Sequence, residues 1–435
     1  MDRAITRQLI KWMGNPNRKP LVLKGVRQCG KTYVLKEFGR MHYQDTVYLN
    51  FEETPSLSAI FEKDLDVQRL LFELGLSAGK SISPRTSLLI LDEIQECPRA
   101  LTALKYFCEN APEYHIACAG SLLGIAIHED QSFPVGKVDI LTLYPMSFLE
   151  FLDALEERPL SKYLEELPLG DTLPAPVHTK LQTALRQYYV TGGMPEAVSA
   201  WCRTKDLSQV EEIQQNILTS YELDFAKHAP VKDFPKLSAI WAAVPQQLAK
   251  PNSKFIFSQV KKGWRAKDLE DALQWLERAG LVHRVCRVEQ PFMPLSSYAD
   301  ASFFKLYLCD IGLLRRLARL PAKILLDSSE LYREFKGAMA ENYVLQELVC
   351  ENLEPLYYWT SGNSAEVDFL AQIDMHIVPI EVKSETNTKA RSLAEYRKKY
   401  QPPHAVIASM EEAFTGDSLI RIPLYLISEI SRVIS

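Results

Sequence analysis

The chain has 435 residues, of which 47% are hydrophobic and 24% are charged. This composition excludes a disordered or fibrous protein, and at about 150 residues per domain the length predicts roughly three domains. The 50 Lys and Arg are balanced by 55 Asp and Glu, a net charge of −5, which excludes a general polyanion binder. Any contact with nucleic acid must therefore be local.

The sequence predicts no leader peptide and no membrane span. Charged residues interrupt every apolar stretch near the N-terminus, and no apolar run reaches the roughly 18 residues of a membrane-spanning helix. The eight cysteines include no Cys-x-x-Cys pair, which is typical of reduced core thiols rather than of a zinc site or a disulfide framework. We therefore expect a soluble cytoplasmic protein without a membrane partner.

The first 150 residues alternate short apolar runs with longer helical patterns. The apolar runs lie at 20–24, 46–51, 87–91, 115–119 and 138–143. This alternation is typical of parallel strands joined by crossover helices, so the predicted fold class is α/β. The run at 87–91 is apolar throughout except for its first serine, which predicts a strand covered on both faces.

The middle of the chain is predicted to be mostly helical. Residues 147–250 have a helical pattern broken by a Thr-Gly-Gly-Met-Pro turn at 191–195, which predicts a helical lid. Residues 255–288 then fit a winged helix-turn-helix. Between 254 and 287 there are eight Lys and Arg against four acids, a surplus of +4 that fits contact with DNA phosphates. A packing or protein-contact module with a solvated charged face stays open as an alternative.

A further α/β unit is predicted after Pro321. Its expected elements are helices over 335–349 and 388–400 and strands at 356–359, 366–371, 378–383 and 405–408. The chain is thus expected to divide into the segments 1–155, 156–235, 236–320 and 321–435.

Residues 25–32 have the pattern G-x-x-x-x-G-K-T and lie between an apolar run and a helical pattern. Glycines let backbone amides and the following helix N-terminus face a phosphate, Lys31 reaches the β- and γ-phosphates, and the Thr32 hydroxyl binds Mg²⁺. The expected cofactors are ATP and Mg²⁺. The nucleotide-binding residues expected in this segment are Gly25, Arg27, Gln28, Cys29, Gly30, Lys31, Thr32 and Tyr33.

Two further segments are expected at the same nucleotide. The apolar residues 88–91 end in Asp92, expected at the Mg²⁺ that accompanies ATP, and in Glu93, which is placed to orient or deprotonate an attacking water. This pair indicates hydrolysis and not only binding. Ser121, at the end of the apolar run 115–119, is a candidate for sensing the γ-phosphate, with an ordinary turn serine as the alternative.

A cluster of carboxylates and a lysine is predicted near the C-terminus. Alternation places Glu381 and Lys383 on one strand face, and a hairpin would bring Asp368 beside them, with Glu341 from a helix completing the set. Two acids can hold divalent metal that activates water, while a lysine orients the nucleophile or neutralises charge. Acids on exposed strands are commonly inert. Asp368 and Glu381, however, lie in apolar strands, where a charge needs a partner ion.

Several segments together resemble a known family, the bacterial and archaeal ATPases that join an AAA-type P-loop domain to a C-terminal DUF4143 domain. The matching segments are GVRQCGKT at 25–32, LDEIQ at 91–95, AGSLLG at 119–124, LYPMSFLEF at 143–151, TGGMPEAV at 191–198, AEN at 340–342, EVDFL at 366–370 and IEVK at 380–383. The resemblance covers nearly the whole chain. It departs from the family at Tyr33, where a small hydroxyl residue is common, and at Cys29, where a small or aliphatic residue is more usual.

The resemblance implies an ASCE/AAA-type P-loop NTPase sheet over 1–155 and a restriction-endonuclease-like PD-(D/E)xK domain over 321–435. The helical lid and the winged helix predicted from the residue patterns would then occupy 156–235 and 236–320. The resemblance also implies that Glu341, Asp368, Glu381 and Lys383 fill the nuclease-like motif. Of these four, Asp368 and Glu381 are the expected ligands of Mg²⁺ or Mn²⁺.

The leading prediction is an ATP-driven or ATP-gated protein that binds and cuts DNA. The alternative is a nucleotide-dependent switch or assembly protein whose C-terminal domain recognises nucleic acid without cutting it. A small-molecule kinase would leave the winged helix and the C-terminal domain without a task. A homo-oligomer is also expected, because AAA-type sites often take an arginine from a neighbouring subunit. No pattern separates the candidate arginines Arg99, Arg186 and Arg203.

Overall fold

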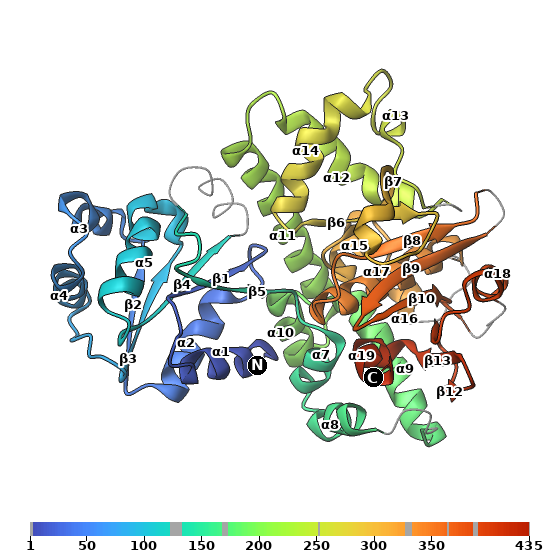
Figure 1. The fold of residues 1–435 in the computed structure, drawn as a ribbon, viewed down its shortest axis with the longest axis horizontal. Coiled ribbons are helices and arrows are strands. Elements are labelled where there is room, and N and C mark those ends of the chain that lie inside the picture. Colours follow the sequence, from blue (N-terminus) through green and yellow to red (C-terminus); the bar gives the residue numbers. More distant parts are fainter. Residues whose placement is uncertain are drawn as a thin grey trace. The chain divides into compact units, whose positions relative to one another are not determined.

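The computed structural model describes residues 3–121, 133–167, 173–250, 253–326, 333–362, 365–385 and 390–434. The chain forms two compact units, Met1–Tyr144 with Arg278–Gly280, and Pro145–Glu277 with Leu281–Ser435 (Figure 1). The predicted division at 155, 235 and 320 is finer than these units and stays a prediction. The predicted segments 119–124 and 388–400 lie partly outside the described residues.

The first unit contains a five-stranded sheet, and each of its strands coincides with one of the predicted apolar runs. The strands are β1 (Leu21–Gly25), β2 (Asp45–Asn50), β3 (Ser87–Asp92), β4 (His115–Ser121) and β5 (Asp139–Leu143). They are all parallel, in the order β2-β3-β4-β1-β5. This parallel sheet with crossover helices confirms the predicted P-loop NTPase fold class.

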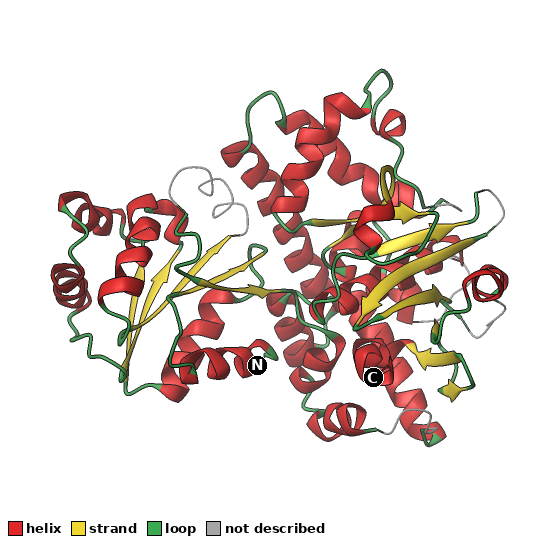
Figure 2. Ribbon diagram, viewed as in Figure 1, coloured by secondary structure: helices red, strands yellow, loops and turns green. Residues whose placement is uncertain are grey.

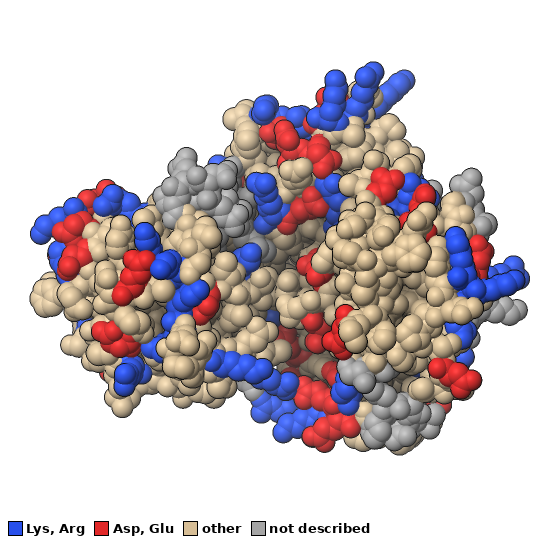
Figure 3. All heavy atoms as spheres, in the orientation of Figure 1, with Lys and Arg blue, Asp and Glu red and all other residues tan. Residues whose placement is uncertain are grey.

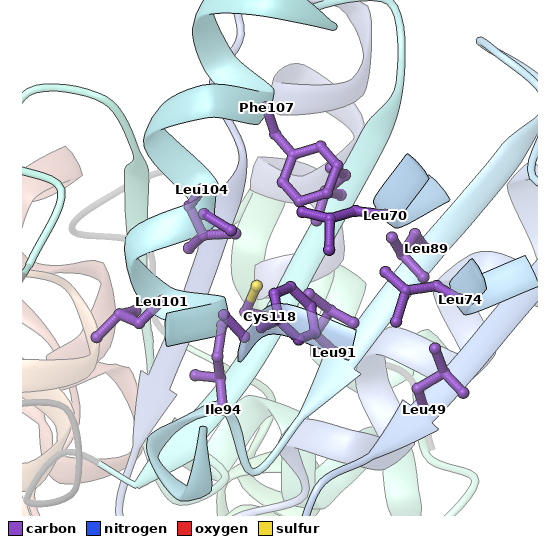
Figure 4. Close-up of a cluster of buried hydrophobic side chains, with 14 of the residues drawn as sticks. Leu49, Leu70, Leu74, Leu89, Leu91, Ile94, Leu101, Leu104, Phe107 and Cys118 are labelled. Atoms are coloured by element: carbon purple, nitrogen blue, oxygen red, sulfur yellow. The ribbon is translucent and has the colours of Figure 1, made fainter. Parts of the chain in front are cut away.

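Helices pack on both faces of this sheet (Figure 2). They are α1 (Ile5–Gly14), α2 (Lys31–His42), α3 (Ser58–Lys63), α4 (Val67–Ala78) and α5 (Pro98–Asn110), with 3-10 turns at Pro55–Leu57 and Ile94–Glu96. Leu89 and Leu91 pack with Leu74 and Phe107 in one core cluster (Figure 4). Every residue of β3 is buried, as expected for a strand covered on both faces.

The second unit begins with a helical region. Its helices are α7 (Phe148–Ala154), α8 (Arg158–Glu166), α9 (Ala175–Thr191), α10 (Pro195–Thr204), α11 (Leu207–His228), α12 (Phe234–Leu248), α13 (Phe257–Val260) and α14 (Ala266–Arg278). Helix α7 starts with a capping box, in which the Ser147 hydroxyl accepts from the Glu150 amide and the Glu150 carboxylate accepts from the Ser147 amide. No helix in the described ranges is long and apolar enough to cross a bilayer.

An eight-stranded mixed sheet follows the helical region in the second unit. Its strands are β6 (Val282–Val288), β7 (Ala299–Leu308), β8 (Tyr357–Thr360), β9 (Glu366–Ile373), β10 (His376–Val382), β11 (Ala405–Ser409), β12 (Phe414–Thr415) and β13 (Leu419–Pro423). The order is β12-β13-β11-β10-β9-β8-β6-β7. The parallel pairing of β6 with β8 therefore joins the hairpin β6–β7 to the C-terminal strands.

Helix α17 (Arg333–Cys350) precedes the three antiparallel strands β8, β9 and β10, and helix α18 (Arg391–Tyr400) leads to β11, which is parallel to β10. The remaining helices are α15 (Ile311–Leu317), α16 (Ala322–Leu326) and α19 (Ile430–Ile434), with 3-10 turns at Leu295–Tyr298 and Leu424–Glu429.

A buried carboxylate holds the Thr-Gly-Gly turn of the sequence motif 191–198. The Asp310 carboxylate accepts hydrogen bonds from the amides of Gly193, at 2.5 Å, and Leu313, at 2.9 Å. A Cβ added at Gly193 would lie 2.2 Å from the Met146 carbonyl oxygen, and one at Gly192 would lie 2.3 Å from Asp310 Oδ1. Gly193 is therefore required by close backbone approach, and Gly192 by its contact with the Asp310 carboxylate and by its φ of +69°.

Candidate functional site

The predicted phosphate-binding loop lies between β1 and α2. Its first glycine is tightly enclosed, because a Cβ on Gly25 would lie 2.3 Å from the Leu143 carbonyl oxygen and 2.9 Å from Cys29 Sγ. Gly30 is the N-cap of α2, with φ +96°, a left-handed conformation that favours glycine. The loop therefore delivers the chain directly to a helix N-terminus, where amides and the helix dipole favour a phosphate.

The side chains of the loop differ in where they point. Lys31 is buried, and its Nζ donates to the carbonyl oxygens of Gly25, at 3.1 Å, and Val26, at 3.0 Å. Cys29 is also buried, with its Sγ 3.5 Å from the Leu143 carbonyl oxygen. Tyr33 is 51% exposed. The ammonium of Lys31 is thus held by backbone carbonyl oxygens of the loop.

Gln28 occupies the left-handed region with φ +65°, and Arg27 Nη2 lies 3.8 Å from Glu52 Oε1. The nucleotide contacts predicted for Arg27, Gln28, Cys29 and Tyr33 stay predictions.

Asp92, at the end of β3, is joined to the loop by direct hydrogen bonds. The Thr32 hydroxyl donates to Asp92 Oδ2 at 2.7 Å, and the Tyr48 hydroxyl donates to the same oxygen at 2.8 Å. The Glu93 amide donates to Asp92 Oδ1 at 3.0 Å. The two residues expected at the Mg²⁺ that accompanies ATP therefore lie together, with Tyr48 as a further neighbour.

Glu93 and Ser121 lie at the same edge of the sheet. Glu93 has φ +49°, and its Oε2 accepts from Gln95 Nε2 at 2.5 Å. A non-glycine residue in this conformation carries strain of the kind concentrated at functional sites. Ser121 is paired in register with Gly25, the first residue of the loop. The parallel strands β1, β3 and β4 thus present their carboxyl ends to one place.

The nucleotide-site residues fit Mg²⁺·ATP. Gly25, Gly30 and the start of α2 provide a backbone cradle, Lys31 supplies a cation, and Thr32 and Asp92 supply the hydroxyl and carboxylate oxygens that Mg²⁺ prefers.

The C-terminal residues predicted from IEVK and EVDFL also come together. Strands β9 and β10 form an antiparallel hairpin in which Ile380 is paired with Phe369. Asp368 Oδ2 accepts from the Val382 amide at 2.7 Å, and Lys383 Nζ lies 2.7 Å from Glu381 Oε1. The hairpin needed to bring Asp368 beside Glu381 and Lys383 is thus present.

Glu341, on α17, reaches the same cluster through a lysine that the sequence analysis missed. Lys305 Nζ, on β7, lies 3.3 Å from Glu341 Oε2, 3.7 Å from Asp368 Oδ1 and 2.8 Å from Glu366 Oε1. The Tyr307 hydroxyl donates to Glu341 Oε2 at 2.7 Å. The cluster therefore contains four carboxylates and two lysines.

Burial controls the electrostatics of this cluster. It raises the pKa of Asp368 well above its usual range, and the neighbouring charges of Glu341 and Glu381 raise it further. Burial likewise raises the pKa of Glu381, although Lys383 opposes the shift. Within the described residues, no group of three or more His, Cys, Asp or Glu is arranged to hold a metal ion. Metal binding by Asp368 and Glu381 accordingly stays a proposal.

The missed residues carried weak signals. Lys305 is the one charge within the apolar run 303–308, and Glu366 has the same alternation as Asp368. Tyr48 lies in the second predicted strand, three residues before its end. It is therefore near the carboxyl edge of the sheet, where the nucleotide-site residues lie. Neither spacing nor charge identified their partners, which lie 36 or more residues away.

Around α14, fewer exposed and unpaired cations are present than the count of Lys and Arg in the sequence suggested. Arg284 is paired with Glu270 and Glu277, and Arg287 is paired with Asp300. Apart from Arg278 at the end of α14, the exposed cations of this region lie in the segment between α13 and the first turn of α14, seen as blue side chains at the top of Figure 3. These residues, which we call the basic turn, are Lys261, Lys262, Arg265 and Lys267.

Three family models match the chain. One is described as an AAA domain and matches residues 17–152, one as a domain of unknown function (DUF8612) and matches 182–324, and one as a domain of unknown function (DUF4143) and matches 336–427. No curated protein matches.

Two solved structures are similar at low identity. The Walker-type ATPase PABY2304 of Pyrococcus abyssi is 15% identical with a TM-score of 0.47, and the match covers 73% of this chain and 95% of that one. Cdc6p from Pyrobaculum aerophilum is 15% identical with a TM-score of 0.25, and the match covers 74% of this chain and 93% of that one. From the domain matches and the loop geometry, the chain carries an AAA-type P-loop ATPase domain followed by a DUF4143 domain.

Proposed function

We propose that this protein is an ATP-driven or ATP-gated DNA-processing enzyme whose C-terminal cluster cuts phosphodiesters with Mg²⁺ or Mn²⁺. The observation that carries the proposal is the convergence of Glu341, Asp368, Glu381 and Lys383 from one helix and one hairpin. A module that only packs against a partner has no need for four buried or half-buried ionisable groups at one place.

At the nucleotide site, each residue has a defined task. The loop amides and Lys31 bind and orient the phosphates, and Thr32 and Asp92 hold the Mg²⁺, which neutralises charge on the phosphates when bound. Glu93, held by Gln95, accepts the proton of the attacking water or orients it.

At the C-terminal cluster, the order of elements supports a PD-(D/E)xK nuclease-like fold. Helix α17, three antiparallel strands, helix α18 and a parallel fourth strand follow one another, with the motif residues on α17 and the β9–β10 hairpin. Asp368 and Glu381 are the proposed metal ligands, and the metal when bound polarises the phosphodiester and activates water. Lys383 orients the nucleophile or neutralises charge developing on the phosphate.

DNA binding is proposed for the region 236–320. Helices α12, α13 and α14 are followed by the antiparallel hairpin β6–β7, and an antiparallel bridge joins Lys254 to Lys305, an arrangement that supports a winged helix. The basic turn lies at the start of α14, where cations and the helix N-terminus favour DNA phosphates.

We further propose that the protein is cytoplasmic and forms a homo-oligomer in which a neighbouring subunit supplies an arginine. Arg99, one of the candidate arginines, is engaged in its own unit, since its Nε donates to the Phe61 carbonyl oxygen at 2.7 Å. Full ATP turnover by a monomer at nanomolar concentration would contradict the oligomer.

One observation favours a second function, a nucleotide-dependent switch that binds nucleic acid without cutting it. Lys305 already neutralises part of the acidic cluster, as a structural ion pair would.

The proposed nuclease is tested with supercoiled and linear DNA in Mg²⁺ or Mn²⁺, with and without ATP. Cutting should be abolished by Asp368→Asn and kept by Asp374→Asn, a matched control in the turn between β9 and β10. The response of cutting to Lys31→Ala shows whether ATP gates it. If the wild type hydrolyses ATP and cuts no DNA, the switch replaces the nuclease.

A further inference from the structure

Lys305 is buried inside the C-terminal acidic cluster, although it comes from the edge strand of the sheet. Strands β6 and β8 lie between β7 and β9 in the strand order, yet the Lys305 ammonium lies 2.8 Å from Glu366 and 3.7 Å from Asp368 on β9. Its side chain is 1% exposed. An ammonium removed from water to this extent is stable only where carboxylates replace its hydration.

The ammonium and a divalent cation need the same oxygens. Lys305 Nζ donates to Glu341 Oε2 at 3.3 Å and approaches Asp368 Oδ1, and both carboxylates belong to the proposed metal-dependent cluster. A carboxylate oxygen that accepts from an ammonium offers less electron density to a metal, and two cations a few ångströms apart repel each other. The two ions therefore compete.

The cluster nevertheless has capacity for another cation. With every group ionised, Glu341, Glu366, Asp368 and Glu381 carry −4 and Lys305 and Lys383 carry +2, so the net charge is −2. Glu381 is 6% exposed, and its Oε2 accepts no hydrogen bond from the described residues, while Oε1 is paired with Lys383. A buried carboxylate oxygen without a hydrogen-bond donor is costly, so Oε2 of Glu381 can accept a further cation.

We propose that Lys305 is an internal competitor of the divalent cation, so that the C-terminal cluster binds metal tightly only when the Lys305 ammonium leaves Glu341 and Asp368. This inference rests on the proposed metal-dependent function of the same cluster. The lysine keeps the acids together when no metal is bound and limits metal binding. Lys305 belongs to the hairpin β6–β7, which follows the basic turn and α14 in the chain.

The test is the Mn²⁺ affinity of the full chain without nucleotide or DNA, measured from the free Mn²⁺ signal in electron paramagnetic resonance. Lys305→Met keeps an unbranched side chain one atom shorter than that of lysine and removes its charge, so it should bind Mn²⁺ at least about 10-fold more tightly than the wild type. Adding Asp368→Asn should abolish the gain. Lys236→Met, which removes another ion-paired lysine of the same unit, should leave the affinity unchanged.

Loss of Lys305 leaves several buried carboxylates together, so folding needs its own readout. Thermal unfolding of Lys305→Met should shift upward in Mn²⁺ more than that of the wild type, and Lys305→Met with Glu366→Gln restores the net charge while freeing Asp368. A Lys305→Met chain that folds only in Mn²⁺ supports the inference. Equal or weaker Mn²⁺ affinity, or a variant that Mn²⁺ does not restore to the fold, overturns it.

This outcome is separable from that of the nuclease assay. If Lys305→Met gains Mn²⁺ affinity and neither chain cuts DNA, the competition stands and the nuclease fails. If the wild type cuts DNA and Lys305→Met shows no gain, the nuclease stands and the competition fails.

Discussion

The Thr32 hydroxyl donates a 2.7 Å hydrogen bond to Asp92 Oδ2, which joins the last residue of the phosphate-binding loop to the end of β3. Tyr48 donates to the same oxygen from β2, so a single carboxylate oxygen receives two hydroxyl donors. These bonds fix the carboxylate before any Mg²⁺ arrives, and pre-organised ligands lose less freedom on binding.

Tyr48 is therefore expected to act as a positioning residue for Asp92. Tyr48→Phe removes one of the two hydroxyl donors to the Asp92 carboxylate and leaves that of Thr32. ATP turnover should fall about 5- to 10-fold, which corresponds to about 1 kcal/mol for a hydrogen bond to a charged group. The Mg²⁺ concentration for half-maximal activity should rise, which a purely structural role would not change. Tyr106→Phe, another partly buried tyrosine of this unit, is the control, and an unchanged Mg²⁺ dependence would contradict the role.

Asp310 should be a strong determinant of stability in the second unit. Asp310→Ala leaves the Gly193 and Leu313 amides buried without an acceptor, so the free energy of unfolding should fall by about 2–4 kcal/mol. Urea unfolding measures the change. Asp417→Ala removes an exposed carboxylate and should cost less than about 0.5 kcal/mol. Equal losses in the two variants would show that the buried contacts contribute little.

Glu347 should make stability depend on pH. Burial raises its pKa to about 8, and its Oε2 accepts no hydrogen bond from the described residues. Between pH 4.5 and 8 the folded chain therefore holds a proton that the unfolded chain has released, so stability falls as the pH rises across this range.

The pH dependence is measured as a difference between variants. Glu347→Gln can still accept from the Phe148 amide and cannot ionise. Its gain in the free energy of unfolding over the wild type should therefore be about 2–4 kcal/mol larger at pH 9 than at pH 5. Glu395→Gln, at an exposed position on α18, should leave the pH profile unchanged. Parallel profiles for wild type and Glu347→Gln would mean that Glu347 is already ionised in the fold.

The basic turn should supply the salt dependence of DNA binding. Changing Lys261, Lys262, Arg265 and Lys267 together to Gln should lower the slope of log affinity against log salt by about 2 to 4, because each phosphate contact contributes about 0.9. Duplex binding at several salt concentrations measures this slope. Lys227→Gln with Lys232→Gln removes exposed cations elsewhere in the same unit and should leave it nearly unchanged. A slope unaffected by the four changes would assign DNA contact to another surface.

The sequence predicted those elements and strand faces that a local residue pattern marks. The runs that became β1, β3 and β4 are apolar because these inner parallel strands are covered on both faces, and the positions of all five strands could be predicted within one or two residues. The two-residue alternation of Glu381 and Lys383 predicted their common face, and a short turn made the hairpin with Asp368 predictable.

The partners of Lys305 and Asp310 could not be predicted from sequence. Lys305 meets Glu341, Glu366 and Asp368 only because β6 pairs with both β7 and β8, and such long-range pairing leaves no periodic signal in the chain. Asp310 meets Gly193 across 117 residues. These contacts depend on how whole elements pack, which local propensity does not encode.

The most direct test of the account is the rate of ATP hydrolysis with and without duplex DNA. If DNA held by the basic turn drives or gates the ATPase, duplex should accelerate hydrolysis by the wild type at least about 3-fold and should not accelerate the chain with all four basic-turn residues changed to Gln. Lys31→Ala, which removes the phosphate-binding cation, supplies the background rate. A wild-type rate that DNA leaves unchanged, in a chain that hydrolyses ATP, would contradict the ATP-dependent processing of DNA.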